Sequence, residues 1–226
     1  PMGMSFEEAK VVRAAVRKKG VVFQFGTQQR SDMYFRWASE LALNGRLGKL
    51  KEIQVGVEGG RQTESFPEQT APGHLDWDRW VGPAPATTYH EKKIQRAYHE
   101  NMTAFSLGMI SCCGIHHLDI AQWGLGMDES GPVEVRPPEK DGDKRGAVLV
   151  YENGVTVHHK DGFGVHFFGA DGEVKVNRGK FELVRGGKVF ARHDGGRGEK
   201  TSCAAEVAKA EKEFLPRAKI RLYKSK

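Results

Sequence analysis

The sequence predicts an α/β fold tending to α+β, with a large, mostly antiparallel open β-sheet and helices on one face of it. Three observations lead to this class. The first 58 residues alternate between helical and extended patterns, as α/β units do. From residue 146 onward the hydrophobic pattern has period two. The 226 residues also include 28 glycines without a collagen-like period, which indicates many turns between strands.

The front of the chain reads as two helix–strand pairs. Ser5 and Glu8 form a capping box at the start of the first helix, and Gly20 ends it. A row of Met33, Trp37 and Leu41 gives the second helix one apolar face. The predicted elements are a helix over 5–19, a strand over 21–25, a helix over 32–44 and a strand over 51–58.

The middle of the chain is less regular. Residues 59–104 have no clear period, and a loop of that length in a compact domain is usually functional, for example as the cover of a binding site. A third helix is predicted over 111–125, ending near Gly126.

The rest of the chain is predicted to be an antiparallel meander followed by one helix. Strands over 146–152 and 155–159 flank Asn153-Gly154, which predicts a type I′ hairpin turn. Four more strands, a final helix and a basic tail follow: 164–168, 173–177, 180–184, 188–192, 202–214 and the residues after Pro216.

Composition excludes several classes of protein. The net charge of +6 comes from 35 basic and 29 acidic residues spread along the chain, so we expect no nucleic-acid partner. No apolar stretch approaches the ~18 residues of a membrane helix, so we expect no membrane partner and a cytoplasmic location. Three cysteines, two of them adjacent, do not form a disulfide framework.

One helix holds the residues that could carry chemistry. Cys112, His116, Asp119 and Trp123 are spaced i, i+4, i+7 and i+11 and therefore share one face of an α-helix. A catalytic helix facing a pocket has this pattern. The alternative is that His116 and His117 are only partly buried histidines with local hydrogen-bond partners. A zinc site of Cys112, His116 and Asp119 is a further alternative.

Four segments resemble the glucose–fructose oxidoreductase / inositol dehydrogenase / MocA (Gfo/Idh/MocA) family of NAD(P)-dependent oxidoreductases. CGIHHLDIAQWGLGMDESGPVEV (113–135) is similar to the helix of its substrate domain. GTQQRSD (26–32) is similar to the segment that leaves its nucleotide-binding domain. LDWDRWVGPAP (75–85) and FFGADGEVKVNRGKFE (167–182) resemble its substrate-domain loop and sheet.

The resemblance implies a division of the chain and a set of partners. Residues 1–30 would be a helix–strand remnant of a Rossmann domain, and residues 31–226 the substrate-binding and oligomerisation domain. Pro1 resembles the end of the family's Glu-Lys-Pro motif, so the chain is expected to be cut at both ends. NAD or NADP would bind the full-length parent and not this chain. The substrate would be a sugar, a cyclitol or a derivative, and the protein a homo-oligomer formed through the sheet.

The resemblance also assigns catalytic roles. The family pattern Asp-x-Gly-x-His-x-x-Asp is matched by Gly114, His116 and Asp119, and His116 would be the general base for hydride transfer to the nicotinamide. The first Asp of the pattern falls on Cys112. A neutral thiol cannot stabilise an imidazolium as a carboxylate does, so His116 is expected to be a weaker base and turnover is in question.

Four further residues are candidates for substrate contact by their position: Arg30, Tyr89, Tyr98 and His117. Two other functions stay open. The domain could be a non-catalytic, self-associating sugar-binding module, or a zinc-dependent hydrolase that uses the cysteine, histidine and aspartate of the third helix. The fragment by itself is expected to be inactive as an oxidoreductase.

Overall fold

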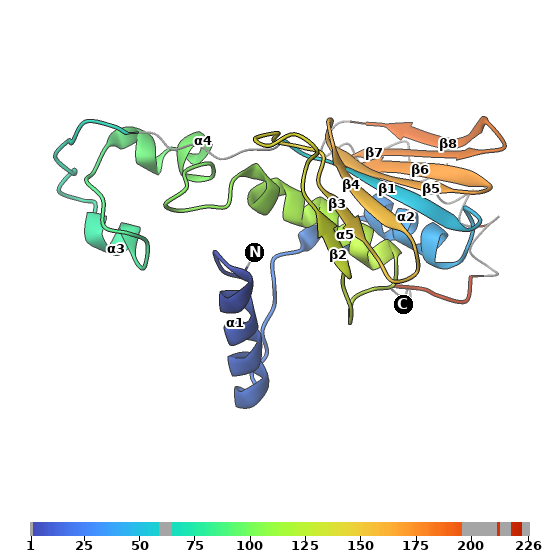
Figure 1. Cartoon of the computed structure of the whole chain (residues 1–226), viewed down its shortest axis with the longest axis horizontal. Coiled ribbons are helices and arrows are strands. Elements are labelled where there is room, and N and C mark those ends of the chain that lie inside the picture. Colours follow the sequence, from blue (N-terminus) through green and yellow to red (C-terminus); the bar gives the residue numbers. More distant parts are fainter. Residues whose placement is uncertain (1, 59–64, 196–211, 213–217, 223–226) are drawn as a thin grey trace. The chain divides into compact units, whose positions relative to one another are not determined.

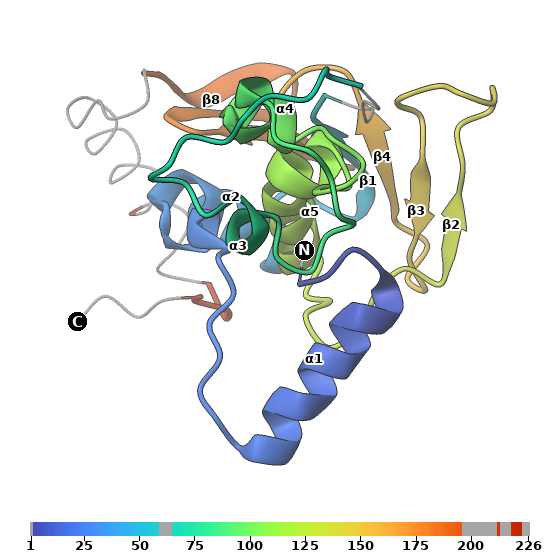
Figure 2. The same cartoon turned by 90° about the vertical axis from the view of Figure 1, so that its left-hand side faces the viewer.

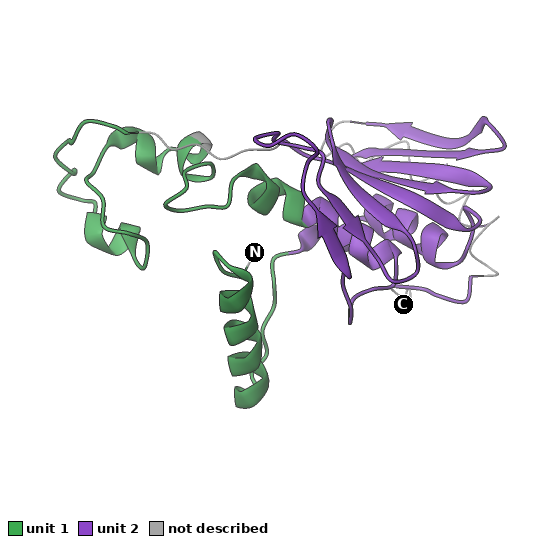
Figure 3. Ribbon diagram, in the orientation of Figure 1, with its two compact units in different colours: residues 1–26, 59–115 green, residues 27–58, 116–226 purple. Residues whose placement is uncertain are grey.

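The computed structural model describes residues 2–58, 65–195, 212 and 218–222. The chain forms two compact units, which Figure 3 colours separately. The first unit comprises residues 1–26 and 59–115, and the second comprises residues 27–58 and 116–226. The predicted helix over 202–214 lies outside the described residues except for residue 212. The division into a Rossmann remnant over 1–30 and a substrate domain over 31–226 stays a prediction.

An eight-stranded sheet dominates the second unit (Figure 1). Its spatial order is β2-β3-β4-β1-β5-β6-β7-β8. The strands are β1 (Leu50–Gly56), β2 (Glu134–Arg136), β3 (Val148–Val150), β4 (Thr156–Lys160), β5 (Gly164–Gly169), β6 (Gly172–Asn177), β7 (Lys180–Arg185) and β8 (Lys188–Asp194). All the predicted strands behind residue 146 are confirmed, while the short edge strand β2 was not predicted.

One pairing in the sheet is parallel. Strand β1 inserts between β4 and β5 and runs parallel to β4 and antiparallel to β5. The remaining pairs are antiparallel, so the predicted meander is interrupted only by this insertion. A strand from the front of the chain can take a central place because its residues Ile53 and Val55 are fully or almost fully buried.

Two helices cover one face of the sheet, as the fold class predicts (Figure 2). They are α2 (Met33–Leu43), whose N-cap Asp32 accepts from two backbone amides, and α5 (Ile115–Gly124). The Trp37 ring of α2 stacks on Phe181 of β7 at a centroid distance of 4.4 Å. In α5, Gly124 leaves room for the ring of Phe167, because a side chain there would overlap it.

Helix α1 (Phe6–Lys19) of the first unit confirms the predicted end residues Ser5 and Gly20, although the Glu8 carboxylate accepts from the amide of Met4 and not from that of Ser5. Ser5 accepts from the amide of Glu8, and Gly20 adopts the left-handed conformation at the C-terminal end. The strand predicted over 21–25 is wrong, since these residues have no regular structure and Val22 is fully exposed. Extended backbone becomes a strand only when a neighbouring strand pairs with it, and no described strand does so here.

Short helices occupy much of the aperiodic middle. The first unit contains α3 (Trp77–Val81), the 3₁₀ turn η2 (Glu91–Ile94), α4 (Arg96–His99) and a π-helical turn, η3 (Ile110–Gly114). The third helix, predicted over 111–125, therefore begins as π-helix and becomes α-helix only at Ile115. A π-turn changes the number of residues per turn, so the i, i+4 argument does not place Cys112 on the face of α5.

The hairpin at Asn153-Gly154 forms, and strands β3 and β4 pair across it. Its turn type was predicted wrongly. A type I′ turn needs positive φ at both central residues, whereas Gly154 has a φ of 82° and no non-glycine residue in the described chain has positive φ. The Asn153 side chain instead accepts from the amide of Val155, which stabilises the turn without a left-handed asparagine.

Candidate functional site

The two adjacent histidines of α5 have different environments. His117 is fully buried, and its Nδ1 donates to the Gly56 carbonyl at 2.9 Å. Its Nε2 lies 3.4 Å from a guanidinium nitrogen of Arg178 and accepts from it. Both ring nitrogens are thus used within the protein. Burial, with a smaller contribution from the charge of Arg178, lowers the pKa of His117 to about 4.

His116 has an unused ring nitrogen. Its buried Nδ1 makes no hydrogen bond with any described residue. Burial lowers the pKa of His116 below its ordinary value and the nearby charge of Arg178 lowers it further, whereas the carboxylate of Asp119 raises it. The ring is therefore neutral at pH 7.

The backbone of His116 is held from the 3₁₀ turn η1 (Gln28–Ser31). In the orientation that satisfies both ends of its amide, Gln29 donates to the His116 carbonyl at 3.0 Å and accepts from Arg178 at 3.0 Å. Gln29 is buried, so this bridge excludes water. The bridge joins η1, the start of α5 and the turn between β6 and β7, and so fixes the position of both histidines.

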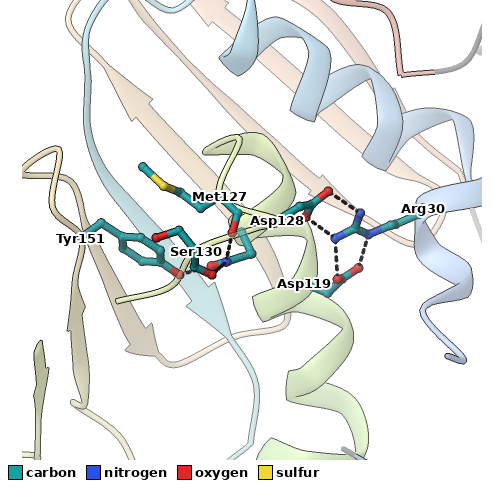
Figure 4. A network of polar contacts seen from close by, with 7 residues as sticks. Arg30, Asp119, Met127, Asp128, Ser130 and Tyr151 are labelled. Atoms are coloured by element: carbon teal, nitrogen blue, oxygen red, sulfur yellow. Dashed lines mark hydrogen bonds and ion pairs between the residues drawn. The ribbon is translucent and has the colours of Figure 1, made fainter. Parts of the chain in front are cut away.

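Asp119 is bound by Arg30 rather than open to solvent. Figure 4 shows the Arg30 guanidinium between Asp119 and Asp128. It donates twice to each carboxylate, at 2.8 Å to both Asp119 oxygens and at 2.7 and 2.9 Å to those of Asp128. These hydrogen bonds outweigh the effect of burial and raise the pKa of Arg30. Arg30 thus links η1 to α5 through Asp119 and to the turn after α5 through Asp128.

A second group of hydrogen bonds, also drawn in Figure 4, holds the turn that follows α5. Gln122 donates to the carbonyls of Met127 and Ser130, and its own carbonyl accepts from the Tyr151 hydroxyl at 2.5 Å. Both ends of the Gln122 amide are therefore satisfied by the protein. The network holds the turn at 127–130, including Asp128, against α5 and the residue that follows strand β3.

The remaining sequence candidates belong to the first unit. Cys112 lies in η3, and burial, followed by the neighbouring Cys113 and Glu100, raises its pKa to about 11. Tyr89 is buried, and its ring meets that of Trp77 edge-on at 5.2 Å. Tyr98 lies edge-on to Phe66 at 5.8 Å. Of the predicted site residues, the second unit brings together only Arg30, His116, His117 and Asp119.

Three residues of this cluster were not predicted. They are Gln29, Asp128 and Arg178, which lie in turns. The position of Asp128, shortly after the end of α5, is the one feature of the sequence that could have indicated its place near that helix. No pattern marks Gln29 or Arg178, because their contacts join segments that are far apart in the chain. Arg178 and His117, for example, are separated by 61 positions.

The zinc alternative finds no ligand set. Among the residues that the structure describes, no three or more His, Cys, Asp or Glu side chains are grouped so that they could hold a metal ion. Asp119 is also occupied by Arg30. In the same described residues, no helix is both long and apolar enough to cross a membrane.

A family model agrees with the fold. The model, described as "Oxidoreductase family, C-terminal alpha/beta domain" of the Gfo/Idh/MocA proteins, matches residues 57–208, more than half of the chain. The chain belongs to the Gfo/Idh/MocA oxidoreductase family. The matched region contains α5 and all strands of the sheet except β1. A sequence search of curated proteins finds no significant match.

Solved structures share the Gfo/Idh/MocA fold at low identity. The aldose-aldose oxidoreductase from Caulobacter crescentus, complexed with glycerol, has 17% identity and a TM-score of 0.54, and the match covers 96% of this chain and 60% of that one. An inositol dehydrogenase homologue from Azotobacter vinelandii, complexed with NADH and myo-inositol, has 13% identity and a TM-score of 0.50, with 83% and 46% covered.

A third structure is not titled as an oxidoreductase. It is the super-repressor mutant of Gal80p from Saccharomyces cerevisiae, with 14% identity, a TM-score of 0.50 and coverage of 100% of this chain and 60% of that one. The present chain thus spans between 46% and 60% of the length of these three structures. These likenesses show the fold that the proteins share.

Proposed function

We propose that this chain is the substrate-binding part of an NAD(P)-dependent oxidoreductase that acts on a sugar, a cyclitol or a derivative, with His116 as the general base. The observation that carries the proposal is the contrast within one histidine pair. His117 is fully buried and uses both ring nitrogens in the protein, whereas the ring of His116 is only half-buried and makes no hydrogen bond with any described residue. A ring that is held in place and keeps a free nitrogen is suited to move a proton.

The environment of His116 favours the neutral ring. Burial and the charge of Arg178 lower its pKa, so at pH 7 the imidazole can accept a proton from a substrate hydroxyl. Gln29 holds the backbone carbonyl of His116 and so orients the residue. When bound, NAD(P) would supply the acceptor for the hydride that leaves the same carbon.

Asp119 and Arg30 are proposed to act at this site, Asp119 through its negative charge near His116 and Arg30 by fixing Asp119. Asp119 raises the pKa of His116 and so opposes the effect of Arg178. Tyr89, Tyr98 and His117 stay proposals for substrate contact. Of these, the two tyrosines have rings packed against aromatic neighbours, and His117 is buried.

An effect of Cys112 on the base rests on the family pattern alone, since the π-turn η3 interrupts the i, i+4 spacing between Cys112 and His116. The raised pKa of Cys112, about 11, keeps the thiol neutral at pH 7. A neutral group at this position of the family pattern gives an imidazolium no charge stabilisation, so turnover should be slow. Restoring the carboxylate with Cys112→Asp should then increase kcat.

The described residues do not fit a nucleotide-binding role by themselves. No described helix begins directly after a strand through a glycine-rich turn of the kind that holds a pyrophosphate. We therefore propose that NAD(P) is bound by another part of the whole protein, and that this chain alone is inactive. The nearest support for the substrate class is that two related structures are titled as complexes with myo-inositol and with glycerol.

The test is NAD- and NADP-dependent oxidation of sugars and cyclitols by the complete natural protein. His116→Gln should lower kcat by about 10²- to 10⁴-fold without loss of thermal stability. His158→Gln, on the uncovered face of the sheet, is the matched control and should leave kcat unchanged. Equal activity of the His116 variant and the wild type would contradict the role of His116.

A non-catalytic function is the second candidate. A protein of this fold is titled as a repressor mutant, so the fold is not confined to proteins titled as oxidoreductases. The edge strand β2 is exposed along its whole length, and Val133 and Val135 are 67% and 62% exposed. We propose that the protein self-associates through this edge of the sheet, because an unpaired edge with apolar side chains favours pairing with another copy.

The two candidates give different results. If the complete protein oxidises no sugar or cyclitol, with or without Cys112→Asp, the non-catalytic function is favoured. Val135→Lys should convert an oligomer to a monomer in light scattering, since a charge on an edge strand opposes pairing. An oligomer that persists in this variant would contradict pairing through β2.

A further inference from the structure

The C-terminal end of α2 lacks the cation that such a helix end favours. Partial negative charge gathers on the last carbonyls of a helix, so a lysine or an arginine is stabilising in the last turn and a carboxylate is not. The last turn of α2 contains no basic residue, and Glu40 lies in it instead. The Glu40 side chain is fully buried. A buried carboxylate at this position needs partners from outside the last turn.

Glu40 receives its partners from two parts of the chain. Within α2, Nη1 of Arg36 lies 3.5 Å from Oε1 of Glu40. The other partners belong to residues 218–222. The Leu222 amide donates to Oε1 at 2.8 Å, and Nε of Arg221 lies 3.5 Å from Oε2. These residues therefore supply the amide and the second positive charge that the helix itself does not provide.

Asn44, which caps the C-terminal end of α2, binds the backbone of the same segment. Its side-chain carbonyl accepts from the Ile220 amide at 2.9 Å, and its Nδ2 donates to the Ile220 carbonyl at 2.8 Å. The same Nδ2 donates to the Glu40 carbonyl at 2.8 Å, which fixes the orientation of the side-chain amide. A residue of a neighbouring β-strand would make the same pair of bonds to Ile220, so Asn44 acts as one residue of a β-ladder.

Few other contacts hold the segment. Ile220 is 41% exposed, whereas Ala218 and Leu222 are half-buried and pack against the hydrophobic core. Each hydrogen bond to the segment contributes little net free energy, and ordering each backbone residue costs a comparable amount. Docking of residues 218–222 is therefore close to balance, and the segment can leave the end of α2 and return.

We propose that Glu40 and Asn44 form a recognition site for an extended peptide that contains an apolar residue, an arginine and a second apolar residue in succession, and that residues 218–222 fill this site within the chain. Asn44 binds the backbone of the first residue, and Glu40 binds the guanidinium of the second and the amide of the third. Arginine suits the site better than lysine, because its planar fork can contact both oxygens of a carboxylate. Oε2 of Glu40 accepts no hydrogen bond from any described residue and so has room for such a donor.

The peptide site is separate from the histidine pair of α5. It lies at the C-terminal end of α2, whereas Gln29 and Arg30 lie in η1, before the N-cap at the other end of the helix. All residues of the peptide site belong to the second unit. The proposal therefore does not depend on the oxidoreductase function.

The first test releases the segment in the full 226-residue chain. Arg221→Glu places a second carboxylate beside that of Glu40, so the segment should leave and the NMR signals of the Asn44 side-chain amide should shift. Lys219→Glu is the matched control, with the same change of charge at an exposed residue, and should leave these signals in place. Ile220→Pro removes the amide that donates to Asn44 and is the second variant should Arg221→Glu not fold.

The second test adds the peptide Ala-Lys-Ile-Arg-Leu, the sequence of residues 218–222, to the Arg221→Glu chain. It should bind with a Kd on the order of 1 mM and return the Asn44 amide signals toward their wild-type positions. The wild-type chain should bind the peptide at least about tenfold more weakly, because its own segment competes at a high effective concentration. The same peptide with Arg221→Glu should also bind the released chain at least about tenfold more weakly.

A change on the helix tests the role of the carboxylate. Glu40→Gln keeps the size of the side chain and an acceptor for the peptide amide, but it removes the negative charge. Combined with Ile220→Pro, it should bind the arginine peptide and the glutamate peptide equally. A preference for the arginine peptide that persists in this double variant would contradict recognition by Glu40.

Three further results would overturn the proposal. They are unchanged Asn44 amide signals in Arg221→Glu, no binding to the released chain at about 10 mM of the arginine peptide, and equal binding of the two peptides to it. Equal shifts in Arg221→Glu and Lys219→Glu would overturn it as well, because the effect would then come from the charge of the chain and not from release of the segment.

Discussion

The buried His117 should make the protein sensitive to mild acid. Its ring is fully buried and its Nδ1 donates to the Gly56 carbonyl, while its Nε2 faces the guanidinium of Arg178. Protonation would place a second positive charge beside Arg178 in a site buried from solvent. For this reason the pKa is lowered to about 4 in the folded protein, from about 6.5 in an unfolded chain.

The size of the effect follows from the two pKa values. The pKa of His117 is lower in the folded state than in the unfolded state. The contribution of the neutral ring to the free energy of unfolding is therefore present in full above about pH 6.5 and is lost as the pH falls toward 4. Between pH 7 and pH 5 the unfolded state takes up a proton that the folded state does not. The free energy of unfolding should therefore decrease by about 2 kcal/mol over that interval from His117 alone.

Urea unfolding at pH 7 and at pH 5, followed by tryptophan fluorescence, measures this decrease. His117→Asn keeps a donor for the Gly56 carbonyl but does not titrate. It should be less stable than the wild type at pH 7 by about 2–3 kcal/mol, because the side chain is smaller. It should also lose about 2 kcal/mol less between pH 7 and pH 5. An equal loss in both proteins would refute the assignment, as would an NMR titration of the His117 ring with a midpoint near 6.5.

Three further perturbations test the structure. Arg30→Met should lower the free energy of unfolding, measured with urea, by about 1–3 kcal/mol, because it leaves two carboxylates without their partner and one of them is largely buried. Arg136→Met, which breaks an exposed ion pair on β2, is the control and should have no measurable effect in the same experiment. Gly56→Ala should cost about 1–3 kcal/mol through its clash with the next loop, whereas Gly131→Ala, with open space around it, should be neutral by thermal unfolding. Cys112 should react with iodoacetamide at pH 8 roughly 100-fold more slowly than free cysteine, since its thiolate is rare; a rate equal to that of free cysteine would contradict the raised pKa.

Local signals in the sequence were reliable where the chain determines its own conformation. The N-cap at Ser5, the glycine that ends α1 and the glycine turns between β5 and β8 act through residues a few positions apart. The strand predicted over 21–25 failed for the opposite reason. Its apolar residues favour an extended backbone, but a strand exists only where another strand pairs with it.

The candidate site was predicted in part. The pattern Gly114-x-His116-x-x-Asp119 marked the helix on which His116, His117 and Asp119 lie, because its residues are close in sequence. The pattern singles out His116, but the different surroundings of His116 and His117 depend on the Gly56 carbonyl at the end of β1 and on Arg178 after β6, which the pattern does not include. Substrate contact by Tyr89 and Tyr98 stays a prediction.

The sequence by itself determined the family, through four segments that resemble it. It also determined most of the long helices and strands and the turns that join the meander, because caps, turns and hydrophobic periodicity are short-range properties. Only the tertiary structure decided that β1 lies between β4 and β5, that Arg30 clamps Asp119 to Asp128, and that one of two adjacent histidines keeps a free nitrogen. Each of these depends on contacts between segments far apart in the chain. Such contacts form only when burial brings the segments together, and no local pattern records them.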